Sequence, residues 1–390
     1  MRRLRFLLTP ASLLALLHIY IGLRILGDLP IGPFGVALGV GALAISWLSI
    51  PLGFVSRRIR NRQLAERLSW LGSLAAGLFS SLFVLTLLRD VALGLFALGM
   101  AALALPGPTF AATKVASAVA VPVFAVLASL IGFVNARRRA RIVDVEVPLA
   151  NLPDALHGFT IAQISDIHVG GTIKRGYVDA IVDAVNQLGA DMIAVTGDLV
   201  DGSVRDLAPH TAPLGRLTAK HGAYLVTGNH EYYSGEPAWT AEFRRLGLRV
   251  LKNEHVVLNH HGAAVVVAGV TDYSAHLFDP AQRSDPGVAL AGAPVGAGAK
   301  LLLAHQPRTA PAASAAGFDL QLSGHTHGGQ FWPWNLFVRL QQPFTAGLHR
   351  LNDLWVYISR GTGYWGPPKR LGAPSEITRL RLVPASQTTA

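Results

Sequence analysis

The sequence predicts two parts of different fold class, an α-helical transmembrane bundle over residues 1–141 and an α/β domain over residues 142–390. Three observations lead to this division. The chain has a mean hydropathy of +0.38 and only 15% charged residues, whereas soluble domains carry roughly 25%. Long apolar runs are confined to the first part. Short Val/Ile/Leu runs alternate with amphipathic helical patterns in the second part.

The net charge of +11 lies almost entirely in the first part. Residues 1–141 hold 15 of the 34 Lys and Arg but only 3 of the 23 Asp and Glu, which leaves 19 basic and 20 acidic residues in the second part. This near-neutral part lacks the basic stripe that nucleic acids require, so no nucleic-acid partner is expected. The absence of Cys excludes a disulfide scaffold and a thiolate metal site.

Apolar runs of about 20 residues, the length that crosses a hydrocarbon core, recur in the first part. We expect a multi-pass helical anchor. Its predicted spans are 6–26, 31–55, 68–88 and 115–134. The apolar run Val91–Leu105 is short for a span and is interpreted as a re-entrant or interfacial element.

Arginine clusters predict the orientation of these helices. They precede the first span, separate the second from the third, and follow the fourth between Arg137 and Arg141. Because cytoplasmic loops are enriched in Lys and Arg, four crossings would place all three clusters and the α/β domain in the cytoplasm. The expected location is a bacterial-type inner (plasma) membrane, with membrane lipids as partners.

Continuous apolar strands that alternate with helices predict a buried sheet in the second part. The clearest helical patterns are Gly176–Leu188 and Ala238–Leu246. The predicted strands are Phe159–Ser165, Met192–Thr196, Ala223–Thr227, Ala263–Ala268, Lys300–Ala304, Leu320–Ser323, Trp355–Ser359 and Ile377–Leu382.

Polar side chains that bind metals follow five of these strands directly. Ligands of α/β sheets collect at the carboxyl ends of strands, so five such turns can converge on one crevice. Carboxylate and amide oxygens mixed with imidazole suit Mn, Fe or Zn. The sequence therefore predicts a centre of two divalent metal ions, with Mn favoured. The residues at these strand ends are Asp166, His168, Asp198, Asp201, Asn229, His230, His305, His325 and His327.

The motifs Asp-x-His, Gly-Asp-x-x-Asp, Gly-Asn-His-Glu, His and Gly-His-x-His stand in the order known from the calcineurin-like metallophosphoesterase superfamily, which residues 157–383 resemble. The apolar N-terminal helices and the run from Arg360 to Arg370 resemble its bacterial membrane-associated phosphodiesterase branch. The resemblance implies a four-layer α+β sandwich for the metallophosphoesterase domain. It also implies that Asp166, His168 and His327 hold one metal ion, that Asn229, His305 and His325 hold the second, and that Asp198 bridges the two.

The resemblance assigns the catalytic roles as well. His230 corresponds to the histidine that donates to the scissile ester, and Asp201 to the carboxylate that orients it. Two metal ions can polarise a phosphoryl group and lower the pKa of a shared water, so that hydroxide attacks in line. Gly202 stands where the protein Ser/Thr phosphatases carry Arg, which argues against a phosphoprotein substrate.

The expected activity is hydrolysis of a phosphodiester or pyrophosphate bond in a phosphorylated small molecule or, because the enzyme is tethered to a bilayer, in a lipid or lipid-linked substrate. Two alternatives stay open. One is a non-catalytic membrane scaffold or sensor that binds a phosphorylated ligand. The other is a nucleotide or nucleic-acid phosphodiesterase.

A segment with the sequence Arg360-Gly-Thr-Gly-Tyr-Trp-Gly-Pro-Pro-Lys-Arg370 contains the candidates for substrate binding, Tyr364, Trp365 and Arg370. They are predicted to recognise a phosphate or headgroup. A structural turn set by the two prolines is the competing interpretation.

A second aromatic segment follows the Gly-His-x-His motif. Its residues Trp332, Trp334 and Phe337 form either an apolar lip that contacts the bilayer or an acyl chain, or ordinary packing under the active-site loop.

Overall fold

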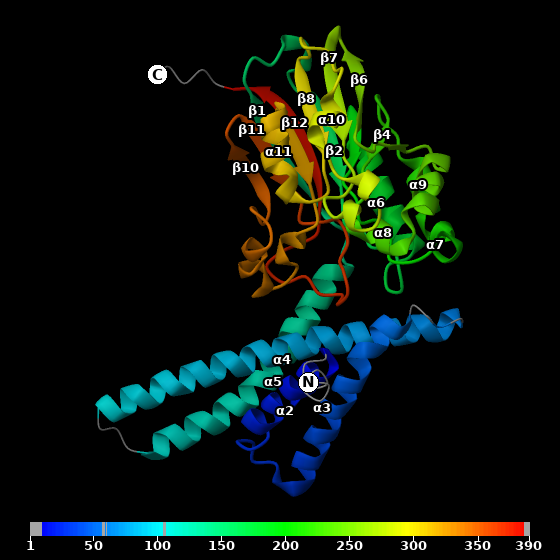
Figure 1. Cartoon of the computed structure of the whole chain (residues 1–390). Helices are drawn as coiled ribbons and strands as arrows, with labels where there is room; N and C mark the ends of the chain where they lie inside the picture. The colour runs from blue at the N-terminus through cyan, green and yellow to red at the C-terminus, as the bar shows by residue number, and fades with distance from the viewer. Residues whose placement is uncertain (1–9, 57–58, 60, 104–106, 386–390) are drawn as a thin grey trace. The chain divides into compact units, whose positions relative to one another are not determined.

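A computed structural model of the chain describes residues 10–56, 59, 61–103 and 107–385 (Figure 1). The chain divides into two compact units. The helical unit comprises Met1–Val134 and Gly366–Lys369, and the α/β unit comprises Asn135–Trp365 and Arg370–Ala390. The sequence placed the boundary at residue 141, whereas the α/β unit begins at Asn135, within the last helix of the first part. Residues Gly366–Lys369, which follow Trp365 of the α/β unit in the chain, belong to the helical unit.

Four apolar helices build the described part of the helical unit and overlap the four predicted spans, although residues 6–9 of the first span lie outside the described residues. Their bounds are Pro10–Ile25 for α2, Gly32–Val55 for α3, Arg62–Ala102 for α4 and Gly107–Arg137 for α5. Helices α3, α4 and α5 are long and apolar enough to cross a membrane, and α2 is shorter. The arginines at positions 2, 3, 5, 57, 58 and 60 lie outside the described residues.

Helix α4 corrects the interpretation of Val91–Leu105. Residues 91–102 are neither a re-entrant nor a separate interfacial element, because they continue α4 without a break as far as Ala102. No proline interrupts this stretch, and isolated glycines are tolerated in a helix. The 41-residue helix is about 60 Å long at 1.5 Å per residue, which is about twice the thickness of a hydrocarbon core.

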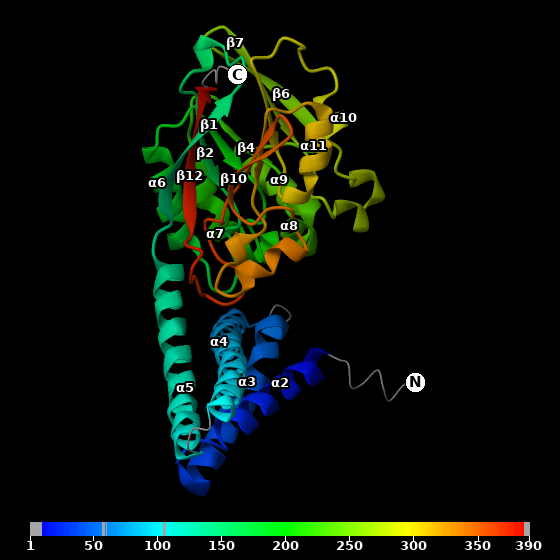
Figure 2. The ribbon, with the colours of Figure 1, turned by 90° about the vertical axis from the view of Figure 1, so that its left-hand side faces the viewer.

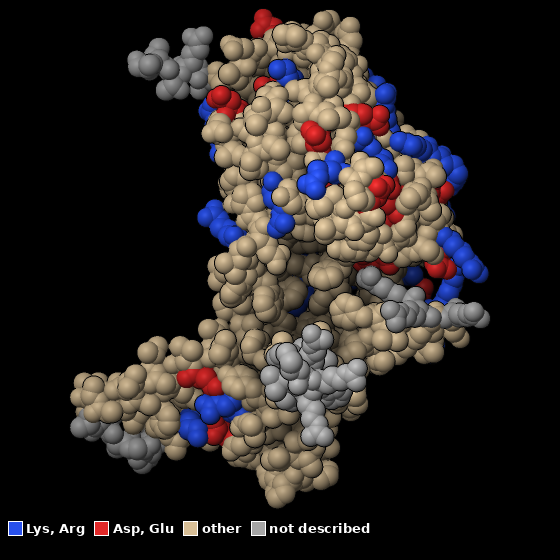
Figure 3. Space-filling view, viewed as in Figure 1, with Lys and Arg blue, Asp and Glu red and all other residues tan. Residues whose placement is uncertain are grey.

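Five charged residues of the helical unit, Arg24, Asp28, Arg89, Asp90 and Lys114, pair with one another. Arg24 Nε lies 2.8 Å from Asp90 Oδ2, and Lys114 Nζ lies 2.9 Å from Asp28 Oδ1. Arg89 is buried, contacts Asp28 and donates to the carbonyl oxygens of Arg24 and Lys114. Figure 3 shows charges of both signs gathered in one place on the helical unit. Pairing of this kind allows ionic side chains to remain among apolar helices.

Close backbone contact joins α3 to α4. A methyl group at Gly72 would lie 2.5 Å from Gly53 N and 2.9 Å from Ser49 O. Small residues of this kind let membrane helices approach until their backbones touch. The same unit contains Lys369, whose ammonium group donates to Gly77 O at 2.9 Å and to the hydroxyl groups of Ser81 and Ser129.

The α/β unit consists of two six-stranded sheets. The first has the order β1-β12-β2-β3-β4-β5 and the second the order β10-β11-β9-β8-β7-β6. Strands β2 to β5 are parallel, as are β7, β8, β9 and β11. The first sheet contains β1 (Arg141–Leu149), β12 (Glu376–Pro384), β2 (Thr160–Ile164), β3 (Met192–Val195), β4 (Ala223–Leu225) and β5 (Arg249–Val250). The second contains β10 (Gly347–Leu351), β11 (Leu354–Ile358), β9 (Leu320–Ser323), β8 (Ala299–Leu303), β7 (Ala263–Gly269) and β6 (Glu254–His260).

Helices cover the outer face of each sheet, so the unit has the predicted four layers. One apolar core lies between the sheets, where Ile161, Leu301 and Leu380 meet. Two outer cores join each sheet to its own helices. Figure 2 shows α6 on one side of the two sheets and α10 and α11 on the other. The helices are α6 (Arg175–Gln187), α7 (Val204–Thr211), α8 (Asn229–Ser234), α9 (Glu236–Arg245), α10 (Pro286–Leu290) and α11 (Ala310–Ala316).

All eight predicted strands are present within one or two residues of their expected bounds. The sequence-based prediction missed β1, β5, β6 and β10. Each of these lies at or next to a sheet edge, and β1 and β6 carry polar and charged residues on their exposed side. Their alternating pattern is weaker than the continuous apolar runs of the central strands.

Gly72→Ala should destabilise the helical unit, because the added methyl group collides with backbone that cannot move independently. Overpacking of this kind costs about 1–3 kcal/mol. The measurement is thermal unfolding of the full chain in detergent, followed by the loss of helical signal. Gly94→Ala on the same helix, where an added methyl group meets nothing within 4 Å, is the matched control. Equal melting temperatures for the two variants would contradict the close α3–α4 contact.

Candidate metal centre

The predicted metal ligands occupy the turns that follow five strands. Asp166 and His168 follow β2, Asp198 follows β3, Asn229 begins α8 after β4, His305 follows β8, and His325 and His327 follow β9. The first three strands belong to one sheet and the last two to the other. The carboxyl ends of both sheets therefore supply the cluster, as the sequence predicted.

Five of these residues have a left-handed backbone, which residues other than glycine rarely adopt. Their φ angles are 54° at Asp166, 57° at His168, 55° at Asp198, 69° at His325 and 51° at His327. The turns hold this conformation through backbone hydrogen bonds, such as Asp166 N to Gly197 O at 2.9 Å and His168 N to Asp198 O at 3.1 Å. Strained backbone of this kind concentrates at functional sites.

The side chains converge in two overlapping groups. Asp166, His168 and His327 form one group, and Asp198, His305 and His325 form another, each with its ligand atoms within 4.8 Å of one another. Asp198 also stands in a third group with His168 and His230, so it lies between the two sets. This is the position in which a carboxylate can bridge two metal ions.

The donor atoms fit divalent cations. His168 Nε2 faces His327 Nε2 at 3.0 Å, and His325 Nδ1 faces His305 Nε2 at 3.2 Å. Asn229 Oδ1 is buried and has no hydrogen-bond partner among the described residues. Carboxylate, amide and imidazole donors that face one another suit Mn, Fe or Zn, and this set does not select one of them.

The surroundings shift the pKa values of these side chains in different directions. Burial lowers the pKa of His325 to about 3. Burial and the neighbouring Arg370 cation hold the pKa of His327 well below its ordinary value. Burial alone would raise the pKa of Asp198, but the neighbouring histidines, His305 first, hold it well below the ordinary value. At neutral pH His325 and His327 are therefore neutral and Asp198 is ionised. Burial lowers the pKa of His305, but the neighbouring Asp198 carboxylate outweighs it and holds this pKa well above its ordinary value.

Glycines admit the close packing of these turns. A methyl group at Gly228 would collide with Asp198 Oδ1 and lie 2.7 Å from Asp198 N. A methyl group at Gly324 would collide with the side chains of Ser165 and Asp166. The backbone itself thus forms part of the wall around the cluster.

His230 and Asp201 form a pair beside the cluster. Asp201 Oδ1 is hydrogen-bonded to His230 Nδ1, and His230 Nε2 lies 4.0 Å from Asp198 Oδ2. Burial lowers the pKa of His230, but Asp198 and Asp201 outweigh it and raise the pKa to about 9. His230 consequently carries a proton at neutral pH. Its ring is flanked by Tyr233 and Trp365, with ring centroids at 5.2 and 5.7 Å.

Glu231 is a supporting residue to which the sequence-based prediction gave no role. Its buried carboxylate accepts hydrogen bonds from the backbone N–H groups of Asp198 at 2.9 Å, Leu199 at 2.7 Å and Gly228 at 2.7 Å. It therefore holds the turn after β3 against the turn after β4. Its position in Gly-Asn-His-Glu was visible in the sequence, but its three partners were not.

Only one of the three predicted substrate-binding residues lies at the surface. Tyr364 and Arg370 are each 1% exposed, whereas Trp365 is partly exposed. The Tyr364 hydroxyl contacts Thr172 O and Arg137. The Arg370 guanidinium donates to the carbonyl oxygens of His327, Arg360 and Gly363. These contacts within the protein favour the competing interpretation of a structural turn for Tyr364 and Arg370. Substrate binding by Tyr364, Trp365 and Arg370 stays a prediction.

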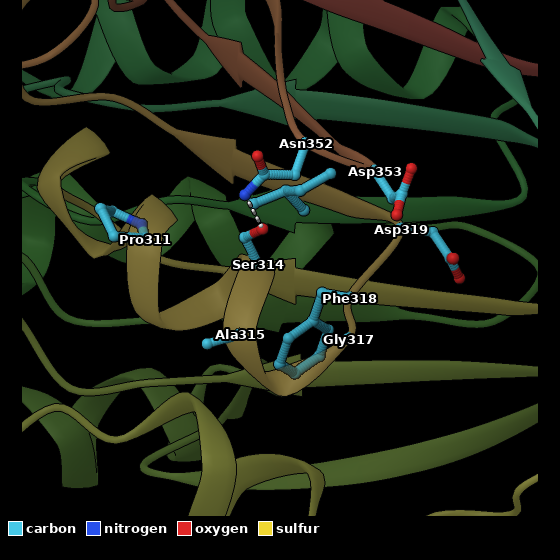
Figure 4. A pocket seen from close by; sticks show the side chains of 9 residues that line it. Pro311, Ser314, Ala315, Gly317, Phe318, Asp319, Asn352 and Asp353 are labelled. Carbon is cyan, nitrogen blue, oxygen red and sulfur yellow. Dashed lines mark hydrogen bonds between the residues drawn. The ribbon is translucent and has the colours of Figure 1, made fainter.

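A surface pocket elsewhere in the α/β unit contains none of these residues. It is lined by α11 and the turn between β10 and β11, and Figure 4 shows Asn352 hydrogen-bonded to Ser314 there, with Asp319 and Asp353 at the edge. The described lining has no imidazole, and we assign it no chemistry.

Gly228→Ala should abolish metal binding although it removes no ligand, because the methyl group displaces Asp198 from the centre of the cluster. The measurement is metal content of the purified full chain after loading with Mn²⁺. Gly176→Ala, at a position in α6 where a methyl group meets nothing within 4 Å, is the matched control. Full metal content in Gly228→Ala would show that Asp198 is not a shared ligand.

Residues 159–329 match the family model described as calcineurin-like phosphoesterase. A Bos taurus protein named "Transmembrane protein with metallophosphoesterase domain" is 40% identical to this chain over 68% of this chain and 62% of the relative. The Danio rerio protein of the same name has 37% identity over 64% of this chain and 59% of the relative. An "Uncharacterized metallophosphoesterase" of Helicobacter pylori is 38% identical over 66% of this chain and 67% of the relative.

The chain thus spans about 60% of the length of the two vertebrate relatives, and the resemblance extends beyond bacteria. Relatives named as transmembrane proteins agree with the long apolar helices, so this is a membrane protein. The ligand motifs assemble between two sheets, and the chain covers two thirds of the length of the Helicobacter pylori relative. The chain therefore belongs to the calcineurin-like metallophosphoesterase family.

Proposed function

We propose that this protein is a membrane-anchored hydrolase of a phosphodiester or pyrophosphate bond that uses two divalent metal ions, with Mn favoured. The observation that carries the proposal is the position of Asp198 between two groups of metal-binding side chains. Asp166, His168 and His327 would hold one ion, Asn229, His305 and His325 would hold the other, and Asp198 would be shared between them. Bound there, two ions supply charge to polarise a phosphoryl group and to activate water.

His230 is the proton donor in this proposal. Its pKa of about 9 keeps a proton on the ring at neutral pH. Asp201 accepts the hydrogen bond from Nδ1, which leaves Nε2 as the nitrogen that delivers a proton to the departing alkoxide. Such a general acid contributes about 10²–10⁴-fold to the rate.

The substrate is a lipid or a lipid-linked molecule. Two features support this. The apolar helices tether the site to a bilayer, and the exposed ring of Tyr233 and the partly exposed ring of Trp365 flank His230. Aromatic rings beside the proton donor can pack against the apolar group that is esterified to the phosphate.

A non-catalytic sensor is the competing function. A sensor that has lost its activity has no need of a charged histidine held by a buried carboxylate beside a complete ligand set. The distinguishing experiment is metal analysis combined with hydrolysis of bis-p-nitrophenyl phosphate by the full chain. Two bound metal ions with turnover support the hydrolase, and metal or ligand binding without turnover supports the sensor.

His230→Ala should keep both metal ions and lower kcat about 10²- to 10⁴-fold, because it removes a proton donor rather than a ligand. Metal content and kcat for bis-p-nitrophenyl phosphate are measured on the same preparation. His261→Ala, which removes an exposed histidine far along the chain from every motif, is the control. If the metal-loaded His230→Ala protein turned over at the wild-type rate, His230 would not be the acid.

The α/β unit faces the cytoplasm of a bacterial-type cell in this proposal, since arginines cluster on both sides of the second pair of predicted spans. The chain has no Cys, so single cysteines report the topology directly. Val295→Cys in the α/β unit should resist a membrane-impermeant maleimide in intact spheroplasts and react after lysis. Ile31→Cys, between α2 and α3, should react before lysis. The reverse pattern would place the α/β unit outside.

A further inference from the structure

We infer that residues 332–340, here called the aromatic loop, insert into the boundary between headgroups and acyl chains of the bilayer that holds this protein. The inference deepens the proposed function, on which it rests for the lipid substrate, by giving that substrate a route into the site. The aromatic loop has the sequence Trp-Pro-Trp-Asn-Leu-Phe-Val-Arg-Leu.

The aromatic loop exposes large apolar side chains. Leu336 is 64% and Leu340 80% exposed, and Phe337 is also exposed. None of the residues 332–340 belongs to the described apolar cores of the α/β unit. Ordinary packing under the active-site loop, the alternative that the sequence left open, therefore does not account for these side chains.

The exposure is a feature of ordered backbone. The loop forms two short 3-10 turns, Trp334–Leu336 and Val338–Leu340. Their hydrogen bonds run from Leu336 N to Pro333 O at 2.9 Å and from Leu340 N to Phe337 O at 3.0 Å. The turns press against the metal-ligand motif, since a methyl group at Gly329 would collide with the backbone of Asn335. Gly329 is two residues from His327, so the loop and the metal ligand share one short segment.

Contacts within the α/β unit place the aromatic loop at the end where the chain arrives from α5. Asn135 and Arg137, in the last turn of α5, bind Arg370 O and the Tyr364 hydroxyl. The same segment binds the start of the aromatic loop, through Trp332 N to Leu371 O at 2.9 Å. A further pair of hydrogen bonds joins the Gln330 side chain to the backbone of Trp365.

This placement identifies the occupant. Helix α5 is among those apolar and long enough to span a membrane, so the end of the α/β unit at Asn135 starts close to the lipid surface. Trp and Phe with Leu and a basic residue, here Arg339, are the side chains that settle at this depth of a bilayer. A lipid whose phosphate reaches the metal centre would then keep its acyl chains beside Leu336 and Leu340.

Depth measurements on the full chain test the inference. Leu336→Cys and Leu340→Cys are made in the Cys-free chain, labelled with a nitroxide and reconstituted in vesicles of phosphatidylcholine and phosphatidylglycerol. Val295→Cys, 97% exposed on another loop, is the matched control. We expect O₂ to relax the labels at 336 and 340 more than a water-soluble nickel chelate does, and the opposite order at 295.

Two results would overturn the inference. One is a label at 336 and 340 that behaves like the label at 295. The other is spin–spin broadening at 336 and 340 that disappears on dilution with unlabelled chain, since this would identify a second copy of the protein as the occupant.

A kinetic arm separates this inference from the proposed function. The double variant Leu336→Glu and Leu340→Glu should lower hydrolysis of a phosphodiester lipid in the same vesicles about tenfold and leave bis-p-nitrophenyl phosphate hydrolysis unchanged, with Val295→Glu as control. An equal effect on both substrates would contradict insertion. If the wild-type chain hydrolyses neither substrate, the proposed function fails, whereas the nitroxide depths still decide the insertion.

Discussion

The structure depends on the close approach of backbone turns around one buried carboxylate, that of Asp198. The Glu231 carboxylate draws the turn after β3 against the turn after β4 through three N–H groups. The turn after β2 is tied to the turn after β3 by backbone hydrogen bonds. Because glycine is the only residue that fits at Gly228 and Gly324, the ligand positions, the strand spacing and the sheet packing are set together.

This constraint explains why the ligands carry unfavourable backbone angles. A left-handed conformation costs a residue other than glycine about 1 kcal/mol or more, and each of the five candidate ligands with this conformation carries such a cost. The apolar cores on both sides of each sheet and the hydrogen bonds across the turns offset it. The free energy of packing thus offsets the strain of a backbone that holds carboxylate and imidazole donors toward one another.

The sequence predicted the central strands and the convergence of the candidate ligands, because each candidate ligand stands at a fixed offset from an apolar run. It did not predict what joins the turns. The partners of Glu231 lie on two different strand ends, and Arg370 was interpreted as a phosphate-binding residue because side-chain type alone does not show burial. Within the first part, hydropathy located the helices, but the uninterrupted length of α4 was missed. Arg89 and Asp90 lie inside this helix, and their partners come from elsewhere in the chain: Asp28 and Ser117 for Arg89, and Arg24 for Asp90.

The position of β12 in the first sheet has a consequence for biosynthesis. β12 lies between β1 and β2. Residues that pair between β1 and β12, such as Asp144 and Arg379, are 235 positions apart in the chain. While the ribosome is still adding residues, β1 therefore has no partner and the core beneath it stays open. The apolar helices precede this sheet in the chain, so they are synthesised first, and the first sheet can close only after β12 has been synthesised.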